Sequence, residues 1–108
     1  MSKAEENADL TALVEIDRLV HEPARLAVMA LLYVVDGADF IFLMNQTGLT
    51  WGNISAHLSK LEEAGYLVVE KTFKGKRPNT MLRLTPNGRE AFRDYAGKMR
   101  QLFKDFPG

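Results

Sequence analysis

Apolar residues recur at helical spacing over the first third of the chain. The segment LTALVEIDRLV predicts a first amphipathic helix over residues 10–20. Residues 23–35 are apolar nearly all round and begin with Pro23, which fits the first position of a helix because the N–H it lacks has no partner there. We expect this second helix to lie at the centre of the fold.

Two shorter helical stretches follow, with only one residue between the end signal of one and the cap of the next. Asp39 can cap a helix over residues 39–47, and Gly48 suits the left-handed backbone that ends it. Thr50 can cap the next helix, expected over residues 50–64. Two helices joined by so tight a glycine turn form a helix-turn-helix.

The periodicity changes after this pair of helices. YLVVEKTF and TMLRLT are β-prone runs, and the linking KGKRPN supplies Gly75, Pro78 and Asn79 as turn residues. The pattern predicts a β-hairpin with a basic tip over residues 66–85.

Thr85-Pro86 then begins a last helix, expected over residues 86–106, with apolar residues every three or four positions. A length of 108 residues suits one domain, and no internal repeat or low-complexity segment interrupts residues 1–108. The expected fold is mainly α with a β-hairpin (α+β), in the order of a winged helix-turn-helix.

The segment LTWGNISAHLSKLEEAGYLVVEKTFKGKRPNTMLRLTPNGREAF, residues 49–92, resembles winged-helix regulators related to the MarR and ArsR families. It is most similar to their short prokaryotic members built of one domain. The resemblance implies a dimeric DNA-binding transcriptional regulator. It also implies that residues 50–64 are the recognition helix and residues 74–80 the wing.

Charge is unevenly distributed along the chain, although the formal net charge is zero. Residues 1–22 are acidic, whereas residues 50–89 carry an excess of lysine and arginine. Such asymmetry suggests that a polyanion meets one face of the molecule, but it is also common in proteins that bind none.

The candidate DNA contacts come from the recognition helix and the wing. Small residues allow a helix to enter a major groove about 12 Å wide, and Asn53 can bond an adenine edge. Each helix residue alone fits an ordinary cap or solvated position equally well, whereas for Lys76 and Arg77 we favour a contact with DNA. The candidates are Thr50, Gly52, Asn53, Ser55, Ala56, Ser59, Lys60, Lys74, Lys76 and Arg77.

Two further residues of the same helix allow two readings each. Trp51 is either an anchor beside a phosphate or a partly buried residue, and its angle to the apolar stripe favours partial burial. His57 borders the stripe, and we interpret it as a packing residue rather than a metal ligand because the only other histidine is His21.

An unbroken apolar run departs from the family pattern in the helix before the recognition helix. Residues 40–44 read FIFLM, which covers every side of a helix. Ile41 or Phe42 should therefore need cover. We favour cover from the last helix or a partner subunit over a small apolar ligand.

The apolar surplus of the first and last helices predicts a two-fold homodimer, which would set two recognition helices about 34 Å apart. The alternative is that the last helix folds back on its own domain. The predicted dimer residues are Leu10, Leu13, Phe92, Tyr95, Met99, Leu102, Phe103 and Phe106.

Other classes of function find less support. The chain has no cysteine, no glycine-rich phosphate loop and no converging catalytic groups, so we expect no enzyme, cofactor or metal site. A winged helix that binds protein is the main alternative. RNA binding is disfavoured because no exposed aromatic platform is evident. With a polar N-terminal segment and no membrane-length apolar run, we expect a cytoplasmic protein. The operator, the regulated genes, the sign of regulation and any effector stay open.

Overall fold

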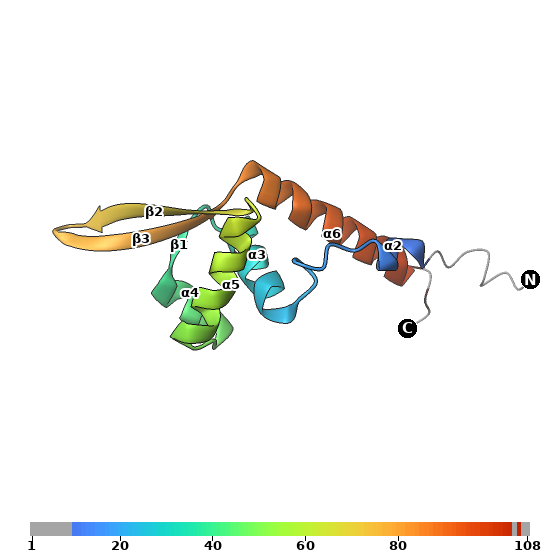
Figure 1. The fold of residues 1–108 in the computed structure, drawn as a ribbon, viewed down its shortest axis with the longest axis horizontal. Helices are drawn as coiled ribbons and strands as arrows, with labels where there is room; N and C mark the ends of the chain where they lie inside the picture. The colour runs from blue at the N-terminus through green and yellow to red at the C-terminus, as the bar shows by residue number, and fades with distance from the viewer. Residues whose placement is uncertain (1–9, 105, 107–108) are drawn as a thin grey trace, which may run out of the picture.

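The computed structural model describes residues 10–104 and 106, apart from the side chains of residues 12 and 13. The predicted dimer contact of Leu13 therefore lies outside the described side chains. The molecule is elongated, with extents of 66 × 25 × 21 Å (Figure 1). A β-hairpin projects at one end, and the long last helix runs toward the other.

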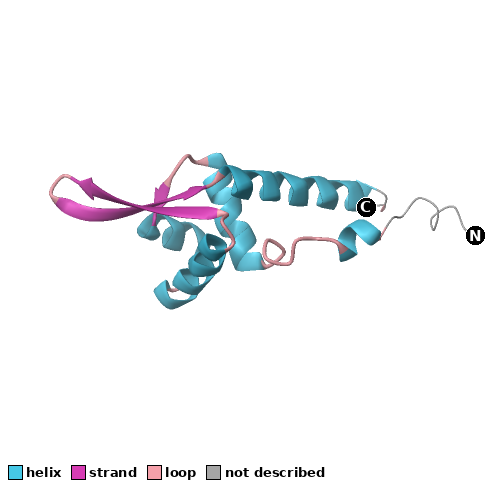
Figure 2. Cartoon of the chain, turned by 45° about the horizontal axis from the view of Figure 1, so that its top comes forward, coloured by secondary structure: helices cyan, strands magenta, loops and turns pink. Residues whose placement is uncertain are grey.

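The order of elements is that of a winged helix. Along the chain they are α2 (Thr11–Val14), α3 (Pro23–Val34), β1 (Ala38–Asp39), α4 (Phe40–Thr47), α5 (Trp51–Glu63), β2 (Leu67–Lys74), β3 (Arg77–Leu84) and α6 (Pro86–Lys104). The strands form an antiparallel sheet in the order β1-β3-β2, and β2 and β3 make up the hairpin (Figure 2).

The predicted cap residues start and stop the helices of the helix-turn-helix. Asp39 accepts a hydrogen bond from the backbone N–H of Phe42 at 2.8 Å, and Thr50 accepts one from Asn53 at 3.3 Å. Gly48 ends α4 with a left-handed φ of 72°, which a residue without a side chain adopts at little cost. These local signals confirm the helix-turn-helix.

The first helix is shorter than predicted, because it ends at Val14 rather than continuing to residue 20. The Asp17 carboxylate accepts hydrogen bonds from the backbone N–H groups of Leu19 and Val20 at 2.9 and 3.4 Å. A side chain that binds its own backbone in this way competes with helix formation. The apolar residues that suggested a longer helix instead pack into the core from a turn, where Val20 is fully buried.

The hairpin turn is tighter than the sequence suggested. Gly75 and Lys76 alone connect the strands, and Gly75 takes a φ of 65°. A glycine with positive φ at the first position of a two-residue loop suits a type II′ turn. Pro78 and Asn79, predicted as turn residues, lie in β3 opposite Phe73 and Thr72. The short β1, which pairs with β3 at Met81 and Leu82, was not predicted.

The core lies where α3 crosses the sheet and the helix-turn-helix, which confirms the central place predicted for this helix. Val28, Met29 and Leu32 of α3 are fully buried, together with Ile54 of α5 and Leu82 of β3. The start of α6 is fixed by a close backbone contact, since a Cβ at Gly88 would lie 2.1 Å from the carbonyl oxygen of Tyr66.

Candidate nucleic-acid interface

Helix α5 has a buried stripe and an exposed arc of small residues. Ile54, Leu58 and Leu61 are buried and hold the helix against the domain. On the other side Gly52, Asn53, Ala56, Ser59 and Lys60 are exposed, and Ser55 is half-buried. A Cβ built at Gly52 would meet nothing within 4 Å. The exposed arc is therefore free for a partner to approach closely.

The first turn of α5 lies at the surface as well. Thr50 is exposed and caps the helix through its hydroxyl. Trp51 is 57% exposed, more than the partial burial we expected, and its ring lies against Phe40, with ring centroids 4.6 Å apart. Its position leaves most of the indole beside the helix N-terminus, where N–H groups suit an anion.

His57 packs through polar contacts on the flank of α5. Its Nδ1 lies 3.1 Å from Nη1 of Arg25 and 3.5 Å from Oε2 of Glu22. Burial raises the pKa of Glu22, but hydrogen bonds from the N–H groups of Arg25 and Ala24, together with the charge of Arg25, outweigh it and leave the pKa below its usual value. In the described part of the chain, no cluster of His, Asp and Glu suited to a metal occurs.

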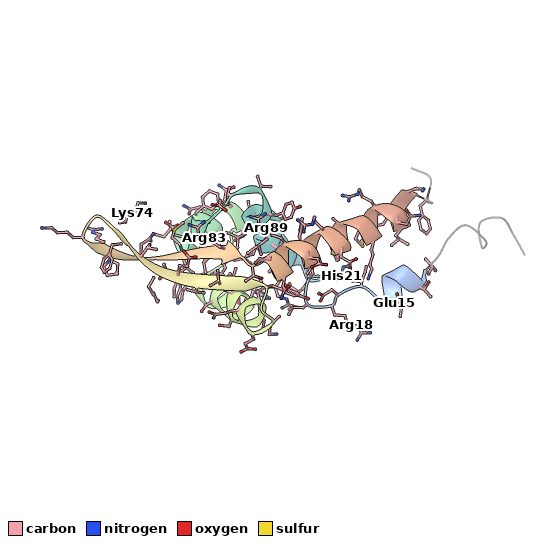
Figure 3. All side chains as sticks on the ribbon, turned by 90° about the horizontal axis from the view of Figure 1, so that it is seen from above. Glu15, Arg18, His21, Lys74, Arg83 and Arg89 are labelled. Atoms are coloured by element: carbon pink, nitrogen blue, oxygen red, sulfur yellow. The ribbon has the colours of Figure 1, made fainter. Side chains whose placement is uncertain are left out.

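The wing carries exposed cations at its tip. Lys74, Lys76 and Arg77 are exposed at the tip of the hairpin, and within residues 10–104 none of them forms an ion pair. At the base of the wing the arrangement is different. Arg83 pairs with both Asp36 and Glu70 at 3.2 Å. Figure 3 shows Lys74 at the far end of the wing and Arg83 nearer the body.

Two large apolar side chains lie at the surface of the wing and of α4, and of these only Phe73 was not anticipated. Phe73 is 74% exposed, and Ile41 is 70% exposed, so the chain itself supplies little of the cover expected over Ile41. Phe42 is half-buried against the core. Trp51 and Phe73 are both exposed aromatic side chains, although the sequence made no exposed aromatic platform evident. Strand alternation beyond the core could have indicated Phe73.

The predicted dimer residues divide into two groups. Tyr95 and Leu102 are buried within the chain, each only 7% exposed, and Phe92 and Met99 are half-buried. The Tyr95 hydroxyl lies 2.7 Å from Nδ1 of His21, which ties α6 to the turn before α3. The exposed apolar side chains at this end of the molecule are Leu10, Val14, Phe103 and Phe106. Part of the stripe on α6 thus serves its own domain.

Comparisons with known proteins identify the class. The model of the winged helix DNA-binding domain family matches residues 24–103, and the chain belongs to that family. An uncharacterized protein of Methanocaldococcus jannaschii is 34% identical over 88 residues, covering 82% of this chain and 96% of the relative. The transcriptional regulator homologue of Pyrococcus horikoshii OT3 has a TM-score of 0.82 at 26% identity, covering 87% of this chain and 95% of that one.

Two more distant structures share the fold. CouR, a transcriptional repressor solved bound to a 23-mer DNA duplex, has a TM-score of 0.74 at 22% identity, covering 95% of this chain and 69% of its own. A MarR-family regulator of Enterococcus faecalis V583 has a TM-score of 0.71 at 20% identity, covering 92% and 89%. The chain is a winged helix DNA-binding domain, and its family and fold are those of DNA-binding regulators rather than of enzymes.

None of the described helices is both long and apolar enough to cross a membrane.

Proposed function

We propose that the protein is a homodimer that binds duplex DNA at a specific, roughly palindromic sequence. In this proposal α5 enters the major groove and the wing lies on the backbone or in the minor groove. The observation that carries the proposal is the exposed arc of small residues on α5, combined with exposed cations on the adjoining hairpin.

The exposed arc supplies side chains of suitable chemistry for reading bases. Asn53 and Ser59 can form hydrogen bonds with base edges, while Gly52 and Ala56 let the helix backbone approach. Thr50 and the free N–H groups at the start of α5 suit a phosphate oxygen. Lys60 adds a positive charge on the same exposed side. CouR, which was solved with bound DNA, has the same fold and supports this reading.

The wing supplies affinity that depends little on sequence. Lys74, Lys76 and Arg77 carry three positive charges at its tip, and Lys71 lies behind them on β2. Contacts of this kind release counterions, so the affinity falls as salt rises. If one protomer neutralises 4 or 5 phosphates, the slope of log affinity against log salt is roughly −4 per protomer.

Dimerisation would use the end of the molecule opposite the wing. Leu10, Val14, Phe103 and Phe106 leave apolar surface exposed there. Contact with a second copy about a two-fold axis would remove this surface from water and place two α5 helices about 34 Å apart. Sedimentation at micromolar concentration should give twice the chain mass of 12.2 kDa. A mass of one chain would end the dimer proposal.

Selection of bound duplexes from random DNA tests the function as a whole. We expect a two-fold symmetric motif, and a change in Trp51 fluorescence when the selected duplex binds. Asn53→Ala should relax the preference at particular base pairs, whereas Asn87→Ala, a change of an exposed asparagine on α6, should leave the motif intact. Failure to bind any duplex at low ionic strength would overturn the proposal.

A protein-binding winged helix is the second candidate, and the exposed apolar side chains favour it. Ile41 of α4 and Phe73 of the wing are each at least 70% exposed, so both leave apolar area in contact with water. Phe73 and Phe42 also line one hollow between the wing and α4. Ile41→Ser with Phe73→Ser should leave DNA affinity unchanged if the surface serves a protein, whereas a loss of DNA affinity would assign it to the duplex.

A further inference from the structure

We propose that Arg25 fixes His57 as the neutral tautomer protonated at Nε2, and that this N–H donates a hydrogen bond to the DNA. The inference rests on the proposed function and adds a contact to it. The sequence indicated His57 only as a packing residue. The contact with Arg25 would leave the proton of His57 on Nε2, from which it can be donated to a partner.

The tautomer follows from the partner of Nδ1. Arg25 Nη1 lies 3.1 Å from His57 Nδ1, and a guanidinium group stays charged and has only donors. Nδ1 must therefore accept this hydrogen bond, and the single proton of a neutral imidazole is then on Nε2. Arg25 is itself held, because its Nε donates to the Leu19 carbonyl oxygen at 2.6 Å and its side chain is only 11% exposed.

The other ring nitrogen is available to a partner outside the chain. Both polar contacts of His57 run through Nδ1, and His57 has no further interaction among the described residues. No side-chain nitrogen or oxygen in the described part of the chain is both buried and unpartnered. Nε2 therefore reaches the surface, in agreement with a side chain that is 23% exposed.

His57 lies along the same edge of α5 as two predicted DNA contacts. Asn53, His57 and Lys60 are spaced by four and then three residues, which aligns them on one side of a helix. Asn53 and His57 also line a common hollow with Thr47 and Leu49 of the helix-turn-helix. A DNA acceptor that approaches Asn53 therefore also comes close to His57.

Glu22, the nearest acid, does not use the free N–H of His57. Its two carboxylate oxygens accept from the backbone N–H groups of Ala24 and Arg25 at 3.1 and 2.8 Å. The positive charge of Arg25, 3.8 Å away, offsets the charge of Glu22. The donor is therefore suited to one of two DNA acceptors, either a purine N7 or a phosphate oxygen.

Two amide substitutions separate the functions of the two ring nitrogens. The amide nitrogen of His57→Gln can reach the position of Nε2, whereas His57→Asn reaches only the position of Nδ1. We expect His57→Gln to bind the selected duplex within about twofold of the wild type, and His57→Asn to bind about 5- to 10-fold more weakly. Thermal melting of both variants checks the fold. Equal affinities of the two folded variants would overturn the proposed contact.

Modified duplexes identify the acceptor. We would replace single purines by 7-deazapurines, which lack N7, and single phosphates by methylphosphonates, which lack the charge. At one position in the duplex, a modification should weaken binding of the wild type but not weaken binding of His57→Asn any further. If that modification is a 7-deazapurine the acceptor is N7, and if it is a methylphosphonate the acceptor is a phosphate oxygen. If no position shows this coupling, His57 does not contact the DNA.

Nitrogen NMR of the free protein tests the tautomer without any DNA. At mildly alkaline pH the His57 ring should show a protonated Nε2 and an unprotonated Nδ1. Arg25→Met should release this preference, while the signals of His21, which is held by Tyr95, stay as they are. A protonated Nδ1 in the wild type would overturn the inference even if the protein binds DNA. The expected tautomer without DNA binding would instead count against the proposed function alone.

Discussion

The two ends of this elongated molecule expose side chains of opposite chemistry. At one end the wing exposes lysine and arginine at the tip of a hairpin, and at the other the ends of α2 and α6 expose large apolar side chains (Figures 1 and 3). The wing is held by its backbone, because eight residues of β2 pair in register with eight of β3. The side chains at its tip are therefore not needed to hold the hairpin together.

The apolar end differs from the wing because its exposed side chains are unfavourable in water. Val14 is 73% exposed and Phe103 is 61% exposed, so apolar area remains in water there. Exposed apolar area favours association, whereas solvated charge at the wing favours a highly charged partner without any need for burial. One chain thus exposes an apolar surface and a cationic surface, and we propose that they bind a second copy and a duplex.

The largest expected effect comes from placing a charge at the apolar end. Phe103→Asp should weaken dimerisation by at least about 100-fold, because a carboxylate would have to leave water without a partner. Sedimentation equilibrium measures the change. Val34→Asp replaces another exposed apolar residue, at the end of α3, and should leave the dimer intact. Equal effects of both changes would show that the α2–α6 end has no special part in association.

Removing charge from the wing should have the next largest effect. Lys76→Ala with Arg77→Ala should lower DNA affinity about 10- to 100-fold for all sequences and reduce the salt slope by about 2. Fluorescence titration over a range of salt measures both quantities. Arg93→Ala with Arg100→Ala removes two exposed charges from α6 as a control. An unchanged slope in the wing variant would refute the phosphate contacts.

Tyr66 links the base of the wing to the segment that joins α2 to α3, and its loss should cost stability. Its hydroxyl donates to Oδ2 of Asp17 at 2.6 Å. Tyr66→Phe should lower the free energy of unfolding by about 1.5–3 kcal/mol, as expected for a hydrogen bond to a charged group. Denaturant unfolding measures the loss, and Tyr33→Phe serves as the control. If Tyr66→Phe destabilises the protein no more than Tyr33→Phe does, the hydrogen bond to Asp17 does not stabilise the fold.

The same hydrogen bond fixes the pH dependence of that loss. The bond to Asp17, then burial and the charge of Asp17, raise the pKa of Tyr66 to about 12. A raised pKa in the folded state means that the stabilisation is complete below the ordinary value of 10.0 and is lost as pH rises through about 12. The difference between the wild type and Tyr66→Phe should therefore be constant at neutral pH and shrink above pH 10.

The smallest effect is expected at Glu22, which caps α3. Glu22→Gln should cost about 1 kcal/mol at neutral pH, because an amide accepts fewer backbone hydrogen bonds. The pKa of Glu22 is held below its ordinary value of 4.5, so its contribution is present above pH 4.5 and is lost as pH falls through the lower, folded-state pKa. Unfolding curves of both proteins should converge in acid. A constant gap would mean that the carboxylate charge is not the cause.

The parts of the fold that were predicted correctly depend on neighbours in the sequence. The caps at Asp39 and Thr50, the left-handed end at Gly48 and the buried stripe of α5 all follow from residues within a few positions of each other. The exposed arc of α5 follows in the same way, since it is the complement of the stripe. The wing cations are exposed for a similar reason, because a hairpin tip has no core beneath it.

Residues distant in sequence decided what the pattern left open or misjudged. Tyr66 meets Asp17, His57 meets Arg25 and Tyr95 meets His21, and none of these contacts leaves a periodic signal. They explain why His57 has a polar environment and why Tyr95 serves its own domain. Asp17 also shows the limit of periodicity, because its carboxylate accepts backbone hydrogen bonds from Leu19 and Val20 in a segment where the apolar spacing predicts a helix.

The sequence by itself determined the helix-turn-helix, the position of the hairpin and the polar exposed arc of α5, because caps, glycines and hydrophobic spacing act over a few residues. Only the tertiary structure decided which aromatic residues stay in water and which ring nitrogen of His57 faces outward. Those outcomes depend on what chain packing brings alongside each side chain, and that is a property of the whole fold.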